Sequence, residues 1–470
     1  MTSVDPFVAR LRDQLGPVGV LTDATDLARF ETGWRYGKGK ARCVVRPADT
    51  AETSAVLAAC HAAKVRVIAQ GANTGLVAAS NPDASGDMVV LSLERMNKTI
   101  ALDAFNRTVL VDGGVLLSQL NESLAPQGLT FPIDLGADPQ IGGMIATNTG
   151  GTRLLKYGDV RKNLLGLEVV LGEGTVITSL NRLRKNNTGL DDKHLFVGTT
   201  GVFGVVTRAV LQVAPLPKQR AVALVGCRDG EAVLGLLRAM EGELNDVLSA
   251  FEVMSENAMR PVFAHQSVLR NPFGQQPMPA YAVLVELAST LPAGALALGD
   301  VLEAALADHC EKAADAVTDV FMGGDDFWNI RHHISESLRS EGKTLAFDIS
   351  VPRSLLPRFT EAVRAMLAAE YRFIRLCDYG HWGDGGTHLN LVWREADAPR
   401  PSPELVAELQ PRIYDLGVRD YEGSYSAEHC VGPHNQRFFD RYTSAPVKAL
   451  AALLKQHCDP GRLLGTTRLW

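Results

Sequence analysis

The sequence predicts an α+β protein with more than one domain. Its 470 residues are too many for a single hydrophobic core, so two or three domains are expected. The first half alternates short runs of β-branched residues with glycine-rich loops, which is typical of strands joined where the backbone approaches a neighbour closely. From residue 221 onward, strand-like and helix-like stretches alternate, which indicates an antiparallel sheet covered by helices.

The first expected elements form a strand–helix–strand unit. Residues 5–15 can form a leading helix, and Cys43-Val-Val-Arg46 is typical of a strand that ends at Pro47. Asp49, with Glu52 three residues later, matches a capping box and predicts a helix over 50–63. Further strands are expected at 65–69, 108–111, 167–171, 175–178 and 202–213.

Ala214-Pro-Leu-Pro217 marks an expected boundary, because two prolines close the strand run. A last helix is expected over 444–457, ended by Asp459-Pro-Gly461, and the Pro-rich stretch 398–403 is expected to be a surface loop. Between these segments the apolar spacing predicts strands at 221–227 and 281–286 and helices at 230–244, 293–310, 328–339 and 355–367.

Charge and composition exclude several classes of protein. A net charge of −6 gives no basic surface for nucleic acid. No apolar run reaches the ~20 residues that a membrane helix needs. The seven cysteines are scattered without a Cys-x-x-Cys pair, which fits a reducing compartment, and no secretory leader is visible. We therefore expect a cytoplasmic protein without a transmembrane segment that binds no nucleic acid.

The glycine-rich loops of the first half are candidates for binding a phosphate. Gly71-Ala-Asn-Thr-Gly75 and the segment 142–151 could present backbone N–H groups to a diphosphate. Neither has the Gly-Lys-Ser/Thr ending of a P-loop, and neither is a Gly-x-Gly-x-x-Gly that opens a helix, so a Rossmann site is disfavoured. One such loop alone is more often a tight turn. Several loops of this kind in one domain favour a large anionic cofactor.

A second set of candidate residues lies late in the chain. His381 and His388 flank Gly383-Asp-Gly-Gly386, so a turn can bring the two imidazoles together, and Glu428 and His429 follow further on. Two imidazoles and a carboxylate commonly hold a divalent metal with one position open, and a neighbouring histidine is a natural proton acceptor at neutral pH. Ordinary polar loop residues remain the commoner explanation for such a set without other information.

Taken together, these motifs resemble those of the FAD-linked D-2-hydroxy-acid dehydrogenases, nearest to the D-2-hydroxyglutarate dehydrogenase branch. The resemblance implies three parts: an FAD-binding domain in two parts over 1–217, a substrate-binding domain with an antiparallel sheet and helices over 218–422, and a C-terminal segment over 423–470 that packs back on the flavin domain. The FAD-binding domain is expected to be of the p-cresol-methylhydroxylase (PCMH) type, within the vanillyl-alcohol-oxidase superfamily. The matching motifs occur in collinear order at 70–77, 133–137, 141–151, 164–170, 183–189, 380–390 and 426–429.

The resemblance also implies which residues hold FAD. No His or Cys occurs in 70–77, where some members of the superfamily tether the flavin, so we expect non-covalent FAD. The chain departs from the family at Gly198-Thr-Thr-Gly201, where Gly-Ser-Glu-Gly is usual. The implied residues are Gly71, Ala72, Asn73, Thr74, Gly75 and Leu76 at the diphosphate; Pro132, Asp134, Leu135, Gly136, Gly142, Gly143, Ala146, Thr147, Asn148 and Gly151 at the ribityl chain and flavin; and Gly201, Gly204 and Val206 at the adenine side.

For the late cluster, the resemblance implies Zn²⁺ or another divalent ion on His381, His388 and Glu428, with His429 as the catalytic base. Two departures are visible there, since Gly386 replaces a usual Asn and Cys430 a usual Gly. We interpret Cys430 as a small apolar residue rather than a reactive thiol.

The substrate anchor is expected on the helix at 328–339. The resemblance implies that Arg331 binds a carboxylate and that Ser335, four residues on and on the same face, adds a hydroxyl. Asn390 is expected to help hold the substrate. Ala346 occupies the place of a lysine found in the 2-hydroxyglutarate branch, so one cation expected near the substrate is absent.

The expected function is oxidation of a D-2-hydroxy acid to the 2-oxo acid by hydride transfer to flavin N5. D-2-hydroxyglutarate, D-malate and D-lactate are the candidate substrates, because Ala346 leaves the side chain of the acid open. The expected electron acceptor is a quinone or an electron-transfer protein, and a homodimer is considered. Two alternatives stay open: a flavin oxidase that uses O₂ on the same fold, and a non-redox metal-binding protein.

Overall fold

A computed structural model describes residues 5–394 and 403–470, which form two compact units. The N-terminal unit comprises Met1–Gly150, Gly158–Leu216 and Glu428–Trp470. The central unit comprises Pro217–Ala427 and also takes in the short segment Gly151–Tyr157. The Pro-rich loop expected at 398–403 lies, up to residue 402, outside the described residues.

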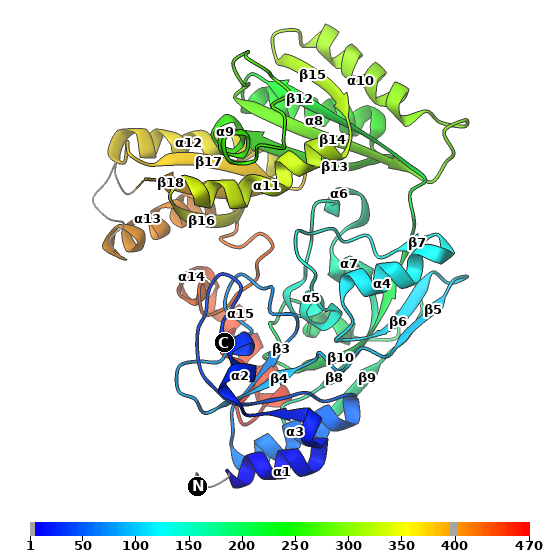
Figure 1. The fold of residues 1–470 in the computed structure, drawn as a ribbon, viewed down its shortest axis with the longest axis vertical. Helices are drawn as coiled ribbons and strands as arrows, with labels where there is room; N and C mark the ends of the chain where they lie inside the picture. The colour runs from blue at the N-terminus through cyan, green and yellow to red at the C-terminus, as the bar shows by residue number, and fades with distance from the viewer. Residues whose placement is uncertain (1–4, 395–402) are drawn as a thin grey trace. The chain divides into compact units, whose positions relative to one another are not determined.

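The N-terminal unit opens with a four-stranded sheet in the order β1-β2-β4-β3. Figure 1 labels β3 and β4 of this sheet. Strands β2 and β3 run parallel to β4, whereas β1 is antiparallel to β2. Asp49 caps α3 by accepting a bond from Glu52 N (2.9 Å), and the Glu52 carboxylate returns to Ala48 N (2.7 Å), so the predicted cap is confirmed. The elements are α1 (Pro6–Leu15), β1 (Val20–Leu21), α2 (Ala24–Glu31), β2 (Ala41–Val45), α3 (Thr50–Ala63), β3 (Val67–Gln70) and β4 (Met88–Ser92).

A second sheet of the same unit has five antiparallel strands in the order β5-β6-β10-β8-β9. Helix α3 contacts β8 and β10, and α5 contacts β6 and β10. A separate two-stranded sheet pairs β7 with β11. The elements are β5 (Ile100–Asp103), β6 (Thr108–Asp112), α4 (Leu117–Leu124), β7 (Leu129–Thr130), α5 (Ile141–Thr147), α7 (Val160–Asn163), β8 (Leu164–Val170), β9 (Val176–Ser179), β10 (Val205–Gln212) and β11 (Ala214–Pro215).

The segment around α5 differs from the sequence expectation. Residues 141–151 were expected to form a loop, but the structure has a helix over Ile141–Thr147. Ile141, Met144 and Ile145 recur at helical spacing and are all buried, so the apolar face outweighs the two glycines between them. The glycine-rich loop is therefore confined to the residues after Asn148, which ends the helix in the left-handed conformation (φ 52°).

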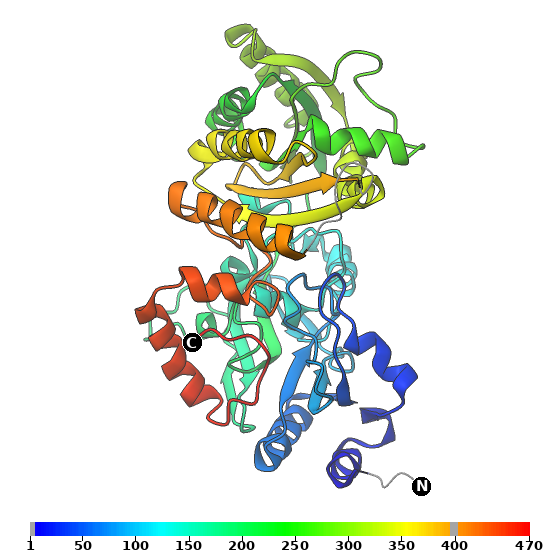
Figure 2. The same ribbon diagram turned by 90° about the vertical axis from the view of Figure 1, so that its left-hand side faces the viewer.

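The C-terminal segment belongs to the N-terminal unit, where helices α14 (Gln436–Tyr442) and α15 (Ala445–Cys458) pack (Figures 1 and 2). Lys455 on α15 is fully buried; its Nζ donates to Val202 O (2.8 Å) and Leu464 O (3.0 Å) and pairs with Asp459 (2.7 Å). These bonds tie the last helix to the loop before β10. The C-terminal segment thus returns to the N-terminal unit, as expected.

The central unit is built on one seven-stranded antiparallel sheet in the order β15-β12-β14-β13-β17-β18-β16. Helices α9 and α11 cover one face, and α8, α10 and α12 contact its strands from the other. No helix among the described residues is long and apolar enough to cross a membrane. The elements are α6 (Leu154–Tyr157), β12 (Gln219–Cys227), α8 (Gly230–Leu244), β13 (Leu248–Ser255), α9 (Glu256–His265), β14 (Tyr281–Ser289), α10 (Leu298–Lys312), β15 (Val317–Gly323), α11 (Asp325–Glu341), β16 (Lys343–Ser350), α12 (Leu356–Glu370), β17 (Arg375–Gly380), β18 (Gly386–Trp393) and α13 (Pro403–Asp415).

Candidate functional site

Strands β17 and β18 form a hairpin whose turn separates His381 from His388. The turn is closed by backbone bonds from Asp384 N (3.0 Å) and Gly386 N (3.1 Å) to His381 O. The two imidazole centroids lie 5.2 Å apart, with the ring planes at 82°. The glycine-rich turn thus brings the two histidines together from opposite sides, as its sequence indicated.

The register of the neighbouring strand adds a carboxylate to this pair. In the β16–β18 ladder, Asp348 lies opposite His388 and Ala346 opposite Asn390. Because side chains alternate along a strand, all four of these residues share one face of the sheet. Asp348 is buried, and its Oδ1 lies 3.7 Å from His388 Nδ1. The sequence showed Asp348 two residues after Ala346, but the strand pairing that brings it to His388 could not be read from it.

Helix α11 covers the same face of the sheet and carries the predicted substrate anchor. Arg331 is 8% exposed, and its guanidinium lies 4.6 Å from the centroid of the Tyr379 ring. Its Nε donates to Glu252 Oε2 on β13 at 2.7 Å. Ser335, one helical turn on, is half-buried. The planar guanidinium is therefore held on two sides before any substrate is present.

Glu252 is a functional candidate that the sequence analysis missed. It is 1% exposed, and its second oxygen, Oε1, lies 2.6 Å from His381 Nδ1. Burial disfavours the charged carboxylate, but His381 and Arg331 outweigh burial and lower its pKa. A glutamate inside the apolar run 248–255 was a visible signal, since a fully buried glutamate is rare unless it is paired.

The predicted flavin-binding segments converge within the N-terminal unit. The Cβ position of Gly71 lies 3.7 Å from Gly143 Cα, and that of Gly201 lies 3.7 Å from Ala69 Cβ, at the end of β3. Three of the four stretches implied at FAD, namely 71–76, 142–151 as far as Gly150, and 201–206, therefore meet around the end of β3, whereas Gly151 belongs to the central unit. The fourth, 132–136, begins with buried residues of the same core.

The local chemistry of these loops fits a large phosphorylated cofactor. A side chain at Gly75, Gly136 or Gly143 would meet no atom within 4 Å, so each leaves open space beside its backbone. Beside Gly71, the buried Gln140 Oε1 has no hydrogen-bond partner among the described residues and could accept one from a bound group.

Two residues predicted to contact the cofactor use their side chains for hydrogen bonds within the protein. The Asn73 amide donates to Thr32 O (2.8 Å), and its Oδ1 accepts a bond from Ser80 (3.0 Å). Asn148 likewise donates to Asp159 (2.9 Å). Both residues have positive φ (58° and 52°), so they shape the loops and leave backbone groups as the candidate cofactor contacts.

Glu428 and His429 are the first two residues of the segment that returns to the N-terminal unit. His429 Nε2 lies 3.9 Å from Glu428 Oε1, and each side chain is about a quarter exposed (25% and 26%). The next residue, Cys430, donates through Sγ to Gly198 O (3.3 Å), and burial raises the pKa of its thiol to about 11. Such a thiol carries little thiolate at neutral pH, in line with its interpretation as an unreactive residue.

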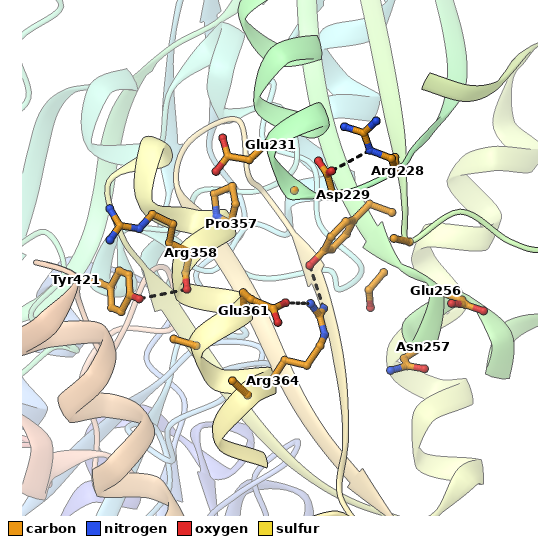
Figure 3. A pocket seen from close by; sticks show the side chains of 16 residues that line it. Arg228, Asp229, Glu231, Glu256, Asn257, Pro357, Arg358, Glu361, Arg364 and Tyr421 are labelled. Atoms are coloured by element: carbon orange, nitrogen blue, oxygen red, sulfur yellow. Dashed lines mark hydrogen bonds and ion pairs between the residues drawn. The ribbon is translucent and has the colours of Figure 1, made fainter. Parts of the chain in front are cut away.

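A cavity of about 850 Å³ lies elsewhere in the central unit, between α8, α9 and α12 (Figure 3). Two pairs of its charged lining residues form ion pairs: Arg228 with Asp229 (3.1 Å) and Arg364 with Glu361 (2.6 Å). Arg364 also donates to the buried Tyr281 hydroxyl (3.1 Å). None of the site residues predicted from the sequence is among its lining residues.

Comparison with known proteins places both halves of the chain. Residues 41–179 match the model of an FAD binding domain, and residues 216–468 match that of the C-terminal domain of FAD linked oxidases. Among solved structures, p-cresol methylhydroxylase superposes with a TM-score of 0.73 over 97% of this chain and 94% of its own, at 16% identity. The protein is thus a flavoprotein of the PCMH fold, which confirms the predicted fold class.

Similarity to known enzymes identifies the family of flavoproteins to which the chain belongs. The D-2-hydroxyglutarate dehydrogenase of Bos taurus is 34% identical over 97% of this chain and 82% of its own length, and that of Arabidopsis thaliana is 32% identical over 97% and 80%. The chain belongs to the FAD-linked D-2-hydroxy-acid dehydrogenase family, in its D-2-hydroxyglutarate dehydrogenase branch. It is an FAD-dependent dehydrogenase that acts on CH–OH groups.

The expected cytoplasmic location is wrong by the same comparison. The names of both of these relatives carry the word mitochondrial. The cysteine argument could not separate the two locations, because scattered, unpaired cysteines mark any reducing compartment and not one in particular.

Proposed function

We propose that the protein oxidises a D-2-hydroxy acid to the 2-oxo acid, with D-2-hydroxyglutarate, D-malate and D-lactate as candidate substrates. One observation carries the proposal: Arg331, a group suited to a carboxylate, and His381, a group suited to a metal, contact the same buried Glu252. An acid held by Arg331 would therefore have its C2 hydroxyl near the imidazoles. The D-2-hydroxyglutarate dehydrogenase names of the relatives support this class of substrate.

The donor set fits a divalent ion, Zn²⁺ or another. His381, His388 and Glu428 would hold it, and Asp348, which lies opposite His388 in the β16–β18 ladder, adds a carboxylate of the kind that such sites use. Imidazole and carboxylate ligands suit borderline ions such as Zn²⁺. When bound, the ion would supply Lewis acidity at the C2 hydroxyl, and FAD would accept the hydride at N5.

The remaining steps fall to side chains of this chain. Arg331 would bind the substrate carboxylate through its Nη groups, because its Nε is already given to Glu252. Ser335, on the same face of α11, would donate a hydrogen bond to the same carboxylate, and Asn390 would contact the acid from β18. His429 would take the hydroxyl proton on a ring nitrogen as the hydride leaves.

Two further features belong to the same proposal. The electrons would pass to a quinone or an electron-transfer protein rather than to O₂, and FAD would be bound without a covalent bond. The second follows from the 70–77 loop, which contains neither His nor Cys. Release of the flavin by acid or heat, with its ordinary absorption spectrum, would test it.

Anaerobic bleaching of the flavin tests the substrate class. D-2-hydroxyglutarate, D-malate and D-lactate are mixed with the purified yellow protein, with the L-enantiomers as matched controls. We expect at least one D-acid to bleach the flavin and the L-acids to fail. Preference for an L-acid, or no bleaching by any acid, would overturn the proposal, and peroxide formed in air would indicate an oxidase.

The base is tested by His429→Asn. The variant should keep the flavin spectrum and the melting temperature but lose about 10²–10⁴-fold in kcat, which is the usual contribution of a general base. Full turnover in this variant would assign the proton transfer to another group.

A further inference from the structure

Glu252 uses both of its carboxylate oxygens for side chains that the proposed function needs. Oε1 lies 2.6 Å from His381 Nδ1, and Oε2 accepts from Arg331 Nε at 2.7 Å. The residue is 1% exposed, so no bulk water can take the place of either partner. A buried carboxylate that loses a partner is strongly disfavoured, so the side chains of His381 and Arg331 are held in place beside Glu252.

The bond to Glu252 decides which nitrogen of His381 is free to bind an ion. A carboxylate accepts hydrogen bonds, so a neutral His381 carries its proton on Nδ1. The lone pair is then on Nε2, at the other side of the ring. Histidine ligands of metals commonly donate their second N–H to a carboxylate in this way, which fixes the ring and raises its basicity.

The same carboxylate fixes the plane of Arg331. With Nε–H bound to Glu252 and the guanidinium 4.6 Å from the centroid of Tyr379, rotation of the group is blocked from two sides. The Tyr379 ring centroid lies 5.3 Å from that of His388, so the aromatic ring connects the anchor to the second imidazole. The terminal nitrogens of Arg331 are thereby held in one orientation for a carboxylate.

We propose that Glu252 is a positioning residue that sets the metal ligand His381 and the substrate anchor Arg331 together. This inference rests on the proposed function, in which His381 holds an ion and Arg331 an acid. Both properties of the site then depend on one side chain that contacts neither the ion nor the acid. Metal retention and acid binding should therefore fall together when Glu252 is changed.

Glu252→Gln tests this directly, because glutamine has the same shape but only one accepting oxygen. Its amide NH₂ would face one of the two donors, and the negative charge that strengthens the hydrogen bonds from both His381 and Arg331 would be lost. We expect about a ten- to hundredfold loss of metal affinity, measured by chelator competition on the purified flavoprotein. Binding of the 2-oxo acid product, measured by calorimetry, should weaken about tenfold or more.

Glu286 offers a matched control in the same sheet. It pairs in register with Ala250 on the neighbouring strand, is 0% exposed, and accepts from Arg153 (2.9 Å), Ser249 (2.7 Å) and Trp328 (3.0 Å). It has the same burial and an arginine partner but no histidine contact among its hydrogen bonds. Like Glu252→Gln, Glu286→Gln should lower the melting temperature, but it should keep metal and acid affinity.

The outcomes separate the two proposals. If wild-type protein binds a divalent ion and the 2-oxo acid, but Glu252→Gln matches Glu286→Gln in both affinities, the positioning role is overturned. A wild-type protein that binds no divalent ion overturns the proposed metal site, and the acid affinity of the two variants then decides about Glu252. Should Glu252→Gln fail to fold, Glu252→Asp replaces it, since the shorter carboxylate keeps the charge but reaches only one partner.

Discussion

Ala346 lies on the face of the sheet where the substrate is proposed to bind, so a change of this one residue should alter which D-2-hydroxy acid is preferred. It is half-buried on β16, opposite Asn390 and two residues before Asp348, on the face that carries His388. We predict that Ala346→Lys raises kcat/KM for D-2-hydroxyglutarate relative to D-lactate by about tenfold or more. A hydrogen bond from a charged group contributes about 1.5–3 kcal/mol, and 1.4 kcal/mol corresponds to a factor of ten.

Ala346→Met is the control for that prediction, since it adds similar length without charge. Steady-state kinetics with both acids on the three proteins measures the ratio. A ratio that rises equally in the Met variant would show that filling space, and not the cation, changes the preference.

Cys430 adopts a backbone conformation that suits glycine. Its φ is 68°, and its thiol donates a hydrogen bond to Gly198 O (3.3 Å). Left-handed geometry costs an ordinary residue about 1–2 kcal/mol, and glycine escapes this cost at the expense of some chain entropy. We predict that the free energy of unfolding of Cys430→Gly is about 1 kcal/mol higher than that of Cys430→Ala, which lacks the thiol but keeps the backbone strain.

Denaturant unfolding of both variants measures that difference. Equal stabilities would mean that the backbone at residue 430 relaxes when the thiol is removed. Because the thiol has a pKa of about 11, alkylating reagents at neutral pH should modify Cys430 slowly in the wild-type protein.

Single elements were predictable where the signal was local. Helix α8 was expected at 230–244 and spans Gly230–Leu244, because Asp229 caps it by accepting from Ala232 N (2.9 Å) and its apolar residues keep one face. The strands of the β16–β18 ladder were not predicted, since their pairing joins residues far apart in the sequence. The histidine pair could be predicted from one turn, whereas Glu252 contacts His381 across 129 residues.

The C-terminal segment is joined to the N-terminal segment by a stacked pair of rings. Tyr36 and His434 lie with centroids 3.6 Å apart and planes at 12°, and His434 N donates to Val77 O (3.2 Å) at the end of the 70–77 loop. Burial, with the nearby charges of Arg35 and Arg437, lowers the pKa of His434 to about 4. In the unfolded chain the same imidazole titrates near its ordinary value of about 6.5.

This shift predicts an acid-sensitive contact. The stability that neutral His434 contributes is fully present above pH ~6.5 and is lost as the pH falls toward 4, where the unfolded state binds the extra proton first. At about 1.4 kcal/mol per pKa unit, the loss amounts to about 3 kcal/mol at most. The variant His434→Phe keeps a ring against Tyr36 but cannot titrate. We predict that its melting temperature falls less between pH 6.5 and pH 4 than that of the wild-type protein. The same slope in both proteins would assign the acid sensitivity to other groups.

At the scale of the whole molecule, the two units have separate cores. The N-terminal unit buries its residues between its own two sheets and helices α3, α5 and α15, and the central unit buries its own around the seven-stranded sheet. Within the N-terminal unit, Lys455 links α15 to Val202, which lies within the stretch 201–206 expected at the adenine of FAD. A ligand bound to the folded unit stabilises it by RT ln(1 + [L]/Kd), or about 2.7 kcal/mol at a hundredfold excess over Kd.

Removal of FAD should therefore loosen one unit and leave the other. We predict that, in the flavin-free protein, amide hydrogen exchange becomes faster across 198–206 and across α15 together, because the buried Lys455 makes them one structure. Exchange in β13 and β14 of the central unit should change little. Exchange is followed by mass spectrometry on holoprotein and apoprotein, with FAD added back as the control for damage. If β13 and β14 lose as much protection as α15, the two units unfold as one, and the flavin stabilises the whole chain.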